Sequence, residues 1–289
     1  MNGFLVINKK KGMTSHDVVA KVRYLLKTKK VGHTGTLDPE TEGVLVLAIN
    51  KATKLINVLE EKHKTYYATA TIGISTETED IYGKIIGKSD ASKIKKEDVL
   101  KAIDILKTQK EQIPPMYSAV KVKGKKLYEY ARANIVVERK PRPISIYRLE
   151  LQSDIRYNDD NTISFDLLIE GSKGIYVRTL IYDLARILHQ EGCMSYLKRL
   201  QSGFFTLEQA YTLEDVENNQ FHLIDVLDVF KDYPTINVNS NLAKMIQNGI
   251  VLDSRQIKTD SIFKVFFEGN LIAIYEPFAE YQYKPVVLF

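Results

Sequence analysis

The 289-residue sequence contains one cysteine, Cys193, and no tryptophan. A single cysteine cannot form an intramolecular disulfide, so a buried core must hold the chain together, and a reducing cytoplasm is the expected compartment. The sequence also lacks an apolar run of the ~18 residues that cross a bilayer, since the run at 44–49 has the length of a buried strand. The apolar patch near the N-terminus precedes the first lysines, the reverse of a secretory signal. We therefore expect no membrane association.

Signatures of metal and nucleotide sites are missing as well. The five histidines are scattered, and none lies at metal-ligand spacing from a cysteine or a carboxylate. The glycine-rich stretch at 31–45 lacks the Lys-Ser or Lys-Thr pair of a P-loop, and it does not match a dinucleotide-binding fingerprint. The sequence contains no Gly-x-Ser-x-Gly elbow either. A site without metal or cofactor is the remaining expectation.

The net charge of +5 conceals two strongly basic segments. Residues 1–35 contain eight lysines and arginines against one acid, and residues 118–143 contain eight against two. Such surfaces suit a polyanion, and nucleic acid is the commonest one. Solvated lysine-rich faces without a partner explain the same pattern, so charge alone leaves both interpretations open.

Apolar residues at helical spacing predict helices at 14–27, 92–109 and 179–192. Thr14 and Asp17 suit a capping box at the start of the first helix. Ser92 is the expected cap of the second helix, and Gly192 the expected stop of the third.

Strands are predicted at 44–50, 65–80, 142–157 and 162–178. From about Lys231 the charge becomes balanced, and the pattern indicates one short helix within a compact set of strands. We therefore predict two domains, at 1–230 and 231–289.

Asp38 stands out within the stretch "VGHTGTLDPETEG". An aspartate before a proline is a good turn residue, and this role alone explains many such positions. Gly32 and Gly35 also allow the backbone to approach a ligand closely, and His33 can stack or donate in the same loop. Asp38 is thus either a turn former or a reactive carboxylate fixed ahead of a buried strand.

Two further residue types fit a site around such a carboxylate. Arg178 is a suitable counterion because a guanidinium is always charged and binds a carboxylate through two bonds, although it also suits an ordinary surface position. Tyr66 and Tyr176 are candidates for base stacking or for simple strand packing. Leu197 suits the core.

Five stretches of the sequence form one ordered set of motifs over residues 3–210. They are "GHTGTLDP" with "GVLVL", "KTYYATATIG", "IPPMYSAVKVKGKKLYEYAR", "SKGIYVRTL" and "YLKRL". In content and order this set resembles the TruB family of tRNA pseudouridine synthases. The resemblance implies an α/β fold of the α+β type, with a mixed, largely antiparallel central sheet, followed by a small PUA-like β domain that binds RNA.

The resemblance also implies a reaction, the isomerisation of uridine-55 in the T-loop of tRNA to pseudouridine, without a cofactor. Asp38 matches the catalytic aspartate, Arg178 its partner and Tyr66 the tyrosine that stacks on the target base. The implied substrate-binding residues are His33, Tyr66, Tyr176 and Leu197. The expected RNA backbone contacts are Lys9, Lys10, Lys29, Lys30, Lys121 and Lys125. The expected partner is the tRNA T-arm, with no obligatory protein partner and a monomeric enzyme.

Several alternatives stay open. Asp38 could attack C1′ of the ribose, add to C6 of the base or remove the 2′ proton. The chain could also be a tRNA-binding folding helper in which catalysis is dispensable, or a relative that modifies another RNA with a guide.

Overall fold

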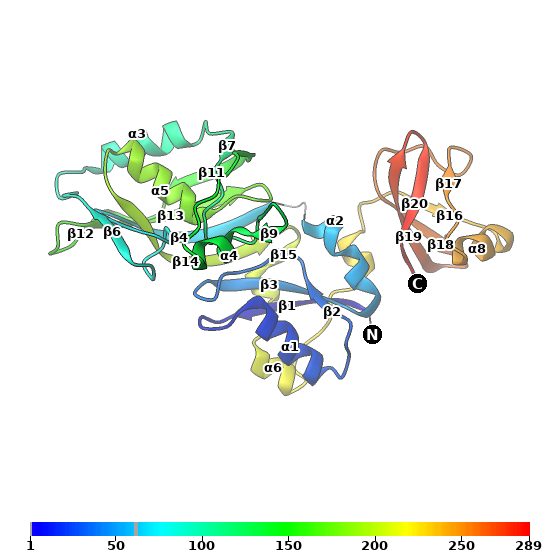
Figure 1. The fold of residues 1–289 in the computed structure, drawn as a ribbon. Coiled ribbons are helices and arrows are strands. Elements are labelled where there is room, and N and C mark those ends of the chain that lie inside the picture. Colours follow the sequence, from blue (N-terminus) through cyan, green and yellow to red (C-terminus); the bar gives the residue numbers. More distant parts are fainter. Residues whose placement is uncertain (1, 61–62) are drawn as a thin grey trace. The chain divides into compact units, whose positions relative to one another are not determined.

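The computed structural model describes residues 2–60 and 63–289 (Figure 1). The chain forms two compact units. Unit 1 comprises Met1–Pro39, Leu45–Glu60 and Glu208–Phe289, and unit 2 comprises Glu40–Val44 and Glu61–Leu207.

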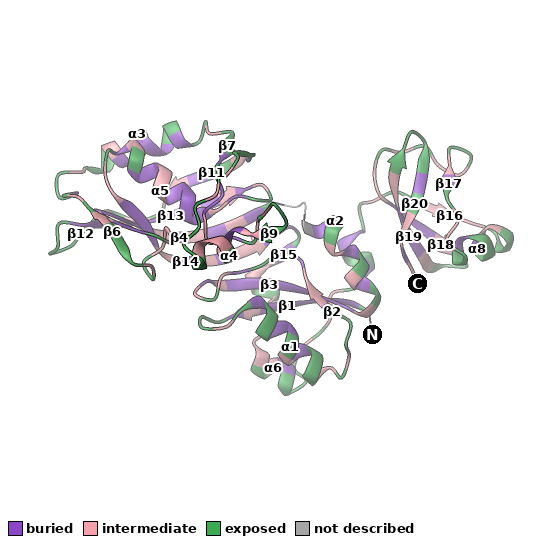
Figure 2. Cartoon of the chain, in the orientation of Figure 1, coloured by how far each residue is buried: buried purple, intermediate pink, exposed green. Residues whose placement is uncertain are grey.

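Unit 2 is built on an antiparallel sheet with the strand order β14-β4-β13-β11. Its strands are β4 (Lys64–Ile72), β11 (Ile146–Leu151), β13 (Ile163–Gly171) and β14 (Gly192–Ser202), with β12 (Arg156–Tyr157) beside β13 and β15 (Phe205–Thr206) beside β14. Tyr66, Ala68 and Ala70 on β4 are buried, whereas the residues between them are partly exposed (Figure 2). This period of two gives the sheet one core face and one polar face, as is common for antiparallel sheets.

Helices α3 (Lys96–Leu106) and α5 (Val177–Ile187) cover the core face (Figure 1). The predicted cap at Ser92 is wrong. The N-cap is Lys95, whose amide donates to the Asp98 carboxylate at 3.0 Å, because Ser92 instead joins a turn with Asp90.

Helix α5 also ends differently from the prediction, because Gly192 does not stop it. The left-handed position after the helix belongs to His189, with φ 55°. Gly192 is the first residue of β14, where a Cβ would lie 2.3 Å from the Ala185 side chain. Close packing of helix against strand therefore explains this glycine.

Strand β3 (Glu42–Ile49) starts in unit 2, where it runs parallel to β14 with Gly43 opposite Arg199. Gly43 has φ +101°, and a Cβ there would lie 2.1 Å from the Arg199 carbonyl oxygen. A side chain at this position would push the two strands apart, so the close approach requires glycine.

The remaining elements of unit 2 are short. β5 (Ile74–Thr76) pairs with β6 (Ile85–Lys88), and β7 (Glu111–Gln112) pairs with β10 (Arg142–Pro143). The basic segment 118–143 contains a hairpin of β8 (Lys121–Val122) and β9 (Lys125–Lys126), followed by α4 (Leu127–Arg132).

Unit 1 begins with β1 (Gly3–Lys9), α1 (Ser15–Leu25) and β2 (Val31–His33). The predicted capping box is confirmed, since the Thr14 amide donates to Asp17 at 2.8 Å and the Asp17 amide donates to Thr14 Oγ1 at 3.1 Å. The rest of β3 pairs with β2, and apolar residues of α1, β1 and β3 form the core. Shorter helices follow: η1 (Asn50–Leu55), α2 (Ile56–Glu60), η2 (Leu207–Gln209), which starts in unit 2, α6 (Leu213–Glu217) and α7 (Val226–Val229).

The C-terminal part of unit 1 contains a five-stranded sheet in the order β16-β18-β19-β20-β17. Its elements are β16 (Thr235–Asn237), α8 (Ser240–Gln247), β17 (Leu252–Asp253), β18 (Phe263–Phe267), β19 (Asn270–Ala279) and β20 (Gln282–Leu288). Its own apolar cluster includes Phe263, Tyr275 and Tyr283. The short helix among strands agrees with the sequence pattern, whereas the domain division at residue 231 stays a prediction.

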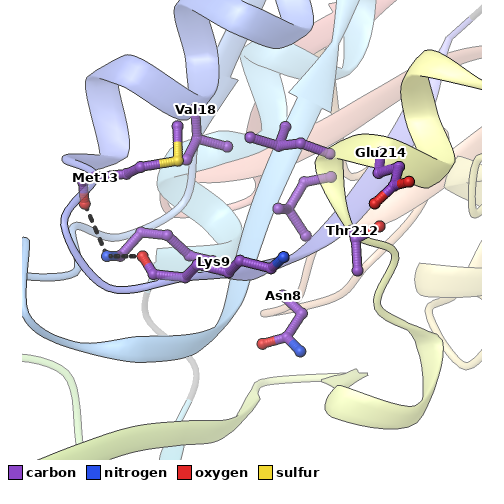
Figure 3. Close-up of a pocket in the computed structure, with 9 residues that line it drawn as sticks. Asn8, Lys9, Met13, Val18, Thr212 and Glu214 are labelled. Carbon is purple, nitrogen blue, oxygen red and sulfur yellow. Dashed lines mark hydrogen bonds between the residues drawn. The ribbon is translucent and has the colours of Figure 1, made fainter.

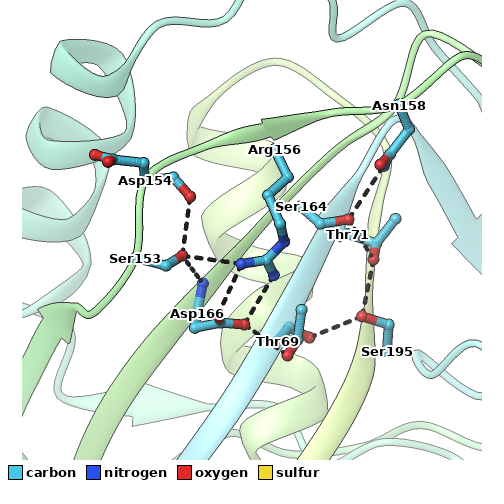
Figure 4. A network of polar contacts seen from close by, with 9 residues as sticks. All are labelled: Thr69, Thr71, Ser153, Asp154, Arg156, Asn158, Ser164, Asp166 and Ser195. Carbon is cyan, nitrogen blue, oxygen red and sulfur yellow. Dashed lines mark hydrogen bonds and ion pairs between the residues drawn. The ribbon is translucent and has the colours of Figure 1, made fainter.

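The polar face of the unit 2 sheet is crossed by a network of hydroxyl, carboxylate and guanidinium groups (Figure 4). Arg156 donates to both oxygens of Asp166, at 2.8 and 2.9 Å, and Thr69 donates to Asp166 at 2.8 Å. These bonds, led by that from Arg156, lower the pKa of the Asp166 carboxyl against the opposing effect of burial. The ionised carboxylate therefore stabilises the fold.

Asp166→Asn is expected to lower the free energy of unfolding by about 1–2 kcal/mol at neutral pH. The pKa of Asp166 is lower in the folded protein than in the unfolded chain. The difference in unfolding free energy between wild type and variant therefore has its full size above pH ~4, and it disappears as the pH falls through the folded-state pKa of Asp166. Urea unfolding across this pH range measures it. Asp154→Asn is the control, since the Asp154 side chain is 90% exposed and its pairing with Lys96 contributes little. A difference that persists unchanged at low pH would contradict the prediction.

Candidate active site

The loop that carries Asp38 is anchored on both sides in unit 1. Ahead of it, the Thr34 amide donates to the Val46 carbonyl at 3.1 Å. Buried Leu37 forms two hydrogen bonds with the Ser15 side chain. The Leu37 amide donates to Ser15 Oγ at 2.9 Å, and Ser15 Oγ donates to the Leu37 carbonyl at 3.2 Å. Asp38 itself is half-buried. Hydrogen bonds hold the main chain of its neighbour Leu37, so the position of Asp38 does not depend on side-chain packing alone.

Lys9 does not lie on an RNA-binding surface, and this part of the sequence prediction is wrong. Its side chain is 1% exposed, and Nζ donates to the carbonyls of Lys10 at 3.0 Å, Met13 at 2.8 Å and Pro39 at 3.0 Å. An ammonium group has three donors, so these bonds satisfy it. Pro39 directly follows Asp38, so Lys9 fixes the other side of the loop.

A small cavity lies beside Lys9, between β1, α1 and the start of α6 (Figure 3). Its volume is about 70 Å³, and Met13, Val18 and Leu213 contribute to its lining. Pockets for small-molecule ligands are several times larger, at roughly 300–1,000 Å³. This cavity is therefore a packing feature and not a substrate site.

Lys9→Met is expected to destabilise unit 1 by about 2–4 kcal/mol, because three carbonyls lose a charged donor. Activity is expected to fall about tenfold or more, since the loop after Asp38 is released. Urea unfolding and single-turnover rates measure the two effects. Exposed Lys51 provides the control, because Lys51→Met removes the same charge without touching the loop, and Lys51 is not among the predicted RNA contacts. Equal effects of the two variants would show that Lys9 contributes only its charge.

His33 lies in the same loop and packs edge-on against His16, with 5.9 Å between ring centroids. The Gly35 amide donates to His33 Nδ1 at 3.3 Å, which fixes the ring further. His16 was not among the predicted site residues, because a histidine on the first turn of a helix gives no signal by itself. The structure thus brings Asp38, His33 and His16 onto one part of unit 1.

Tyr66 and Leu197 lie together in unit 2, on the adjacent strands β4 and β14. Leu197 is opposite Ala68, two residues from Tyr66, and both side chains belong to the buried cluster under α5. Tyr66 is 7% exposed and Leu197 8%. The prediction of a buried Leu197 is confirmed, while stacking by Tyr66 stays a prediction.

Tyr176 is the N-cap residue of α5, and Gln112 holds its main chain on both sides. The Tyr176 amide donates to Gln112 Oε1 at 2.8 Å, and Gln112 Nε2 donates to the Tyr176 carbonyl at 3.1 Å. This amide clamp sets where α5 begins. It therefore also sets the position of Arg178, two residues further on.

Arg178 is 5% exposed and connects three segments of unit 2. Its Nη1 donates to the Thr78 carbonyl and its Nη2 to the Tyr117 carbonyl, both at 2.9 Å. Nη1 also lies 3.6 Å from Asp80 Oδ2. The guanidinium is thus fixed in direction before any substrate binds, which is the main use of arginine over lysine at such a site.

Asp80 was missed by the sequence prediction, which included it in a long strand. The chain turns after β5, and Asp80 forms an isolated bridge with Met194 on β14. In this turn Thr78 Oγ1 and the Tyr82 amide donate to Asp80 Oδ1 at 2.8 and 3.1 Å. The preceding Glu79 is half-buried, and its desolvation raises the pKa of its carboxyl. The acidic stretch "TETED" was the available signal, but a sequence does not show which carboxylate meets an arginine almost 100 residues away.

The exposed lysines of the prediction are Lys10, Lys29, Lys30, Lys121 and Lys125. Two of them, Lys121 and Lys125, lie on the β8–β9 hairpin. Lys126 on β9 and Arg132 on α4 each lie 5.4 Å from the Tyr128 ring centroid. Their cationic groups are suitable for phosphate contacts, which stay a prediction.

The predicted site residues belong to both units. Asp38 and His33 lie in unit 1, and the others lie in unit 2: Tyr66, Tyr176, Arg178 and Leu197. The pairing of Asp38 with Arg178 joins residues of different units and stays a prediction. In the described ranges, no three His, Cys, Asp or Glu side chains are grouped as a metal site would need. No helix within the described residues has both the length and the apolar character to cross a membrane.

Solved structures share this fold. A chain in the crystal structure of a Cbf5-Nop10-Gar1 complex matches with a TM-score of 0.70 at 22% identity, over 99% of this chain and 83% of that one. A chain in an H/ACA RNP bound to a substrate RNA containing 2'-deoxyuridine matches with a TM-score of 0.66 at 20% identity, over 96% and 78%. At this identity the likeness shows the fold, and it agrees with the predicted α+β architecture of mixed strand orientation.

Sequence comparison gives the family. The tRNA pseudouridine synthase B of Bacillus subtilis (strain 168) is 44% identical over 96% of this chain and 93% of its own length. That of Oceanobacillus iheyensis is also 44% identical, over 100% of this chain and 98% of its length. Residues 23–177 match the N-terminal domain of TruB family pseudouridylate synthases, and residues 178–228 match the tRNA pseudouridylate synthase B C-terminal domain. The chain therefore belongs to the TruB family of pseudouridine synthases, which are isomerases of RNA uridines.

Proposed function

We propose that this enzyme isomerises uridine-55 in the T-loop of tRNA, with Asp38 as the reacting carboxylate. The substrate class is supported by relatives called tRNA pseudouridine synthase B at 44% identity over nearly the whole chain. The observation that carries the role of Asp38 is its anchoring. Lys9 and Ser15 hold the residues on both sides of Asp38 by main-chain contacts.

The reaction is an isomerisation, so atoms and electrons balance without a second reactant. The C1′–N1 bond breaks, the uracil turns, and a C1′–C5 bond forms. C5 then loses a proton and N1 gains one. Asp38 serves as the nucleophile at C1′, adds to C6, or removes the 2′ proton; each route needs an ionised carboxylate that is held against the nucleotide.

We assign to the other residues the roles that the matching family motifs imply. Tyr66 stacks on the flipped uracil, with Tyr176 and Leu197 lining the pocket, because extrusion of a base must be offset by new contacts. Arg178 faces Asp38 and favours its ionised form. His33 occupies space beside the flipped nucleotides.

Exposed lysines at 10, 29, 30, 121 and 125 contact T-arm phosphates, and residues 231–289 act as a PUA-like RNA-binding domain. Phosphate contacts give affinity with little sequence choice, and this affinity falls as salt rises. We propose a monomeric enzyme of the cytoplasm that needs no cofactor, guide RNA or protein partner.

A minimal assay tests this function. The purified full chain is incubated with a T-arm stem-loop alone, and pseudouridine is located by chemical labelling and primer extension. Product at position 55 is the expected result. A stem-loop with cytidine at 55 is the matched control and should stay unmodified. Product that forms at other uridines, or that requires an added guide RNA, would refute the proposed specificity.

A further inference from the structure

Arg199 is among the largest fully buried side chains of the described residues, with 2% exposure. It lies on β14, directly opposite Tyr66 on β4 and opposite Gly43 on β3. Gly43 follows Asp38 by five residues in the sequence. Arg199 thus lies between β4, which carries the predicted stacking residue Tyr66, and the first residues of β3, which follows the Asp38 loop.

The guanidinium of Arg199 contacts both of these strands. Its Nε donates to the Val44 carbonyl on β3 at 2.7 Å. On the other side lies the Tyr66 side chain, which is directly opposite Arg199 on β4. Complete burial lowers the pKa of the guanidinium, and the interaction with Tyr66 opposes this lowering. Arg199 still carries its charge, because arginine is not deprotonated in proteins.

A buried cation is a poor way to gain stability. Desolvation of a charge costs several kcal/mol, and apolar residues of similar volume often stabilise such positions as well or better. Buried polar contacts are instead a means of specifying one geometry. For Tyr66 this geometry matters: its ring packs in the core, and the interaction with Arg199 fixes the remaining freedom of the ring.

We propose that Arg199 is a positioning residue that fixes the Tyr66 ring relative to the start of β3. The inference rests on the proposed role of Tyr66 as the stacking residue. A ring held in advance binds the flipped uracil without having to be ordered at that moment, and so favours the reacting geometry. Arg199 itself touches no substrate in this proposal.

A double-mutant cycle tests the proposal with the full chain and a T-arm stem-loop under single-turnover conditions. Arg199→Met and Tyr66→Phe are each expected to lower the rate about 10- to 100-fold, with the stem-loop dissociation constant changed less than about threefold. Because both variants remove the same contact, the double variant should be no slower than the slower single variant. Rate losses that multiply, or an Arg199→Met rate equal to the wild type, would overturn the proposal.

Lys198→Met is the matched control, since Lys198 is the neighbour of Arg199 on β14 and lies opposite Tyr67. Its effect on the rate should multiply with that of Tyr66→Phe. If Arg199→Met does not fold, as judged by its melting temperature, Arg199→Lys replaces it and retains one donor. The same cycle then applies: non-multiplying losses support the proposal and multiplying losses refute it. Wild-type activity on the stem-loop tests the proposed function separately from this inference.

Discussion

Asp38→Asn is expected to abolish pseudouridine formation on a T-arm stem-loop, with a loss of at least about 10⁴-fold in the single-turnover rate. An amide has the shape of the carboxylate but is neither a nucleophile nor a base at neutral pH. The anchors of the loop use main-chain atoms of Leu37 and Pro39, so the substitution leaves them in place. RNA binding should therefore change less than about threefold, since one negative charge is removed and no phosphate contact is lost.

The control for this variant is Glu40→Gln, which makes the same change in charge two residues away and should keep nearly full activity. The experiment also separates the enzyme from a folding helper. If Asp38→Asn still refolds tRNA but forms no pseudouridine, the chain has both activities, and only pseudouridine formation needs the Asp38 carboxylate. Full pseudouridine formation by the variant would end the assignment of Asp38.

Arg178→Lys is expected to have the second largest effect, a fall of about 10²- to 10³-fold in rate. The guanidinium donates to the Thr78 and Tyr117 carbonyls and lies beside Asp80. A lysine ammonium is a single point charge, and it cannot keep this spread of contacts while it also makes the proposed pair with Asp38. Arg178→Lys therefore keeps the positive charge but loses the contacts that fix it in the site.

Arg186→Lys makes the same exchange at an exposed position of the same helix and should leave the rate unchanged. Asp80→Asn provides a second measurement, because it weakens the support of Arg178 without removing the cation. Its loss of rate should be smaller than that of Arg178→Lys. A rate for Arg178→Lys within threefold of the wild type would show that charge alone suffices.

The sequence pattern predicted the helices near 14–27, 92–109 and 179–192 to within five residues of each observed boundary, because apolar spacing reports which face is buried. It did not predict β14, the strand at Gly192–Ser202, whose side chains are mixed in polarity. Arg199 on this strand is buried even though its residue type predicts exposure.

The sequence by itself determined the family, the fold class, the local helices and Asp38 as the leading catalytic candidate, because these depend on residue order and on spacing within short stretches. The tertiary structure decided that Lys9 fixes a loop instead of contacting RNA, that Asp80 supports Arg178, and that Arg199 contacts Tyr66. Each of these contacts joins residues between 30 and 133 positions apart. Their strength depends on distance and burial, which local patterning does not encode.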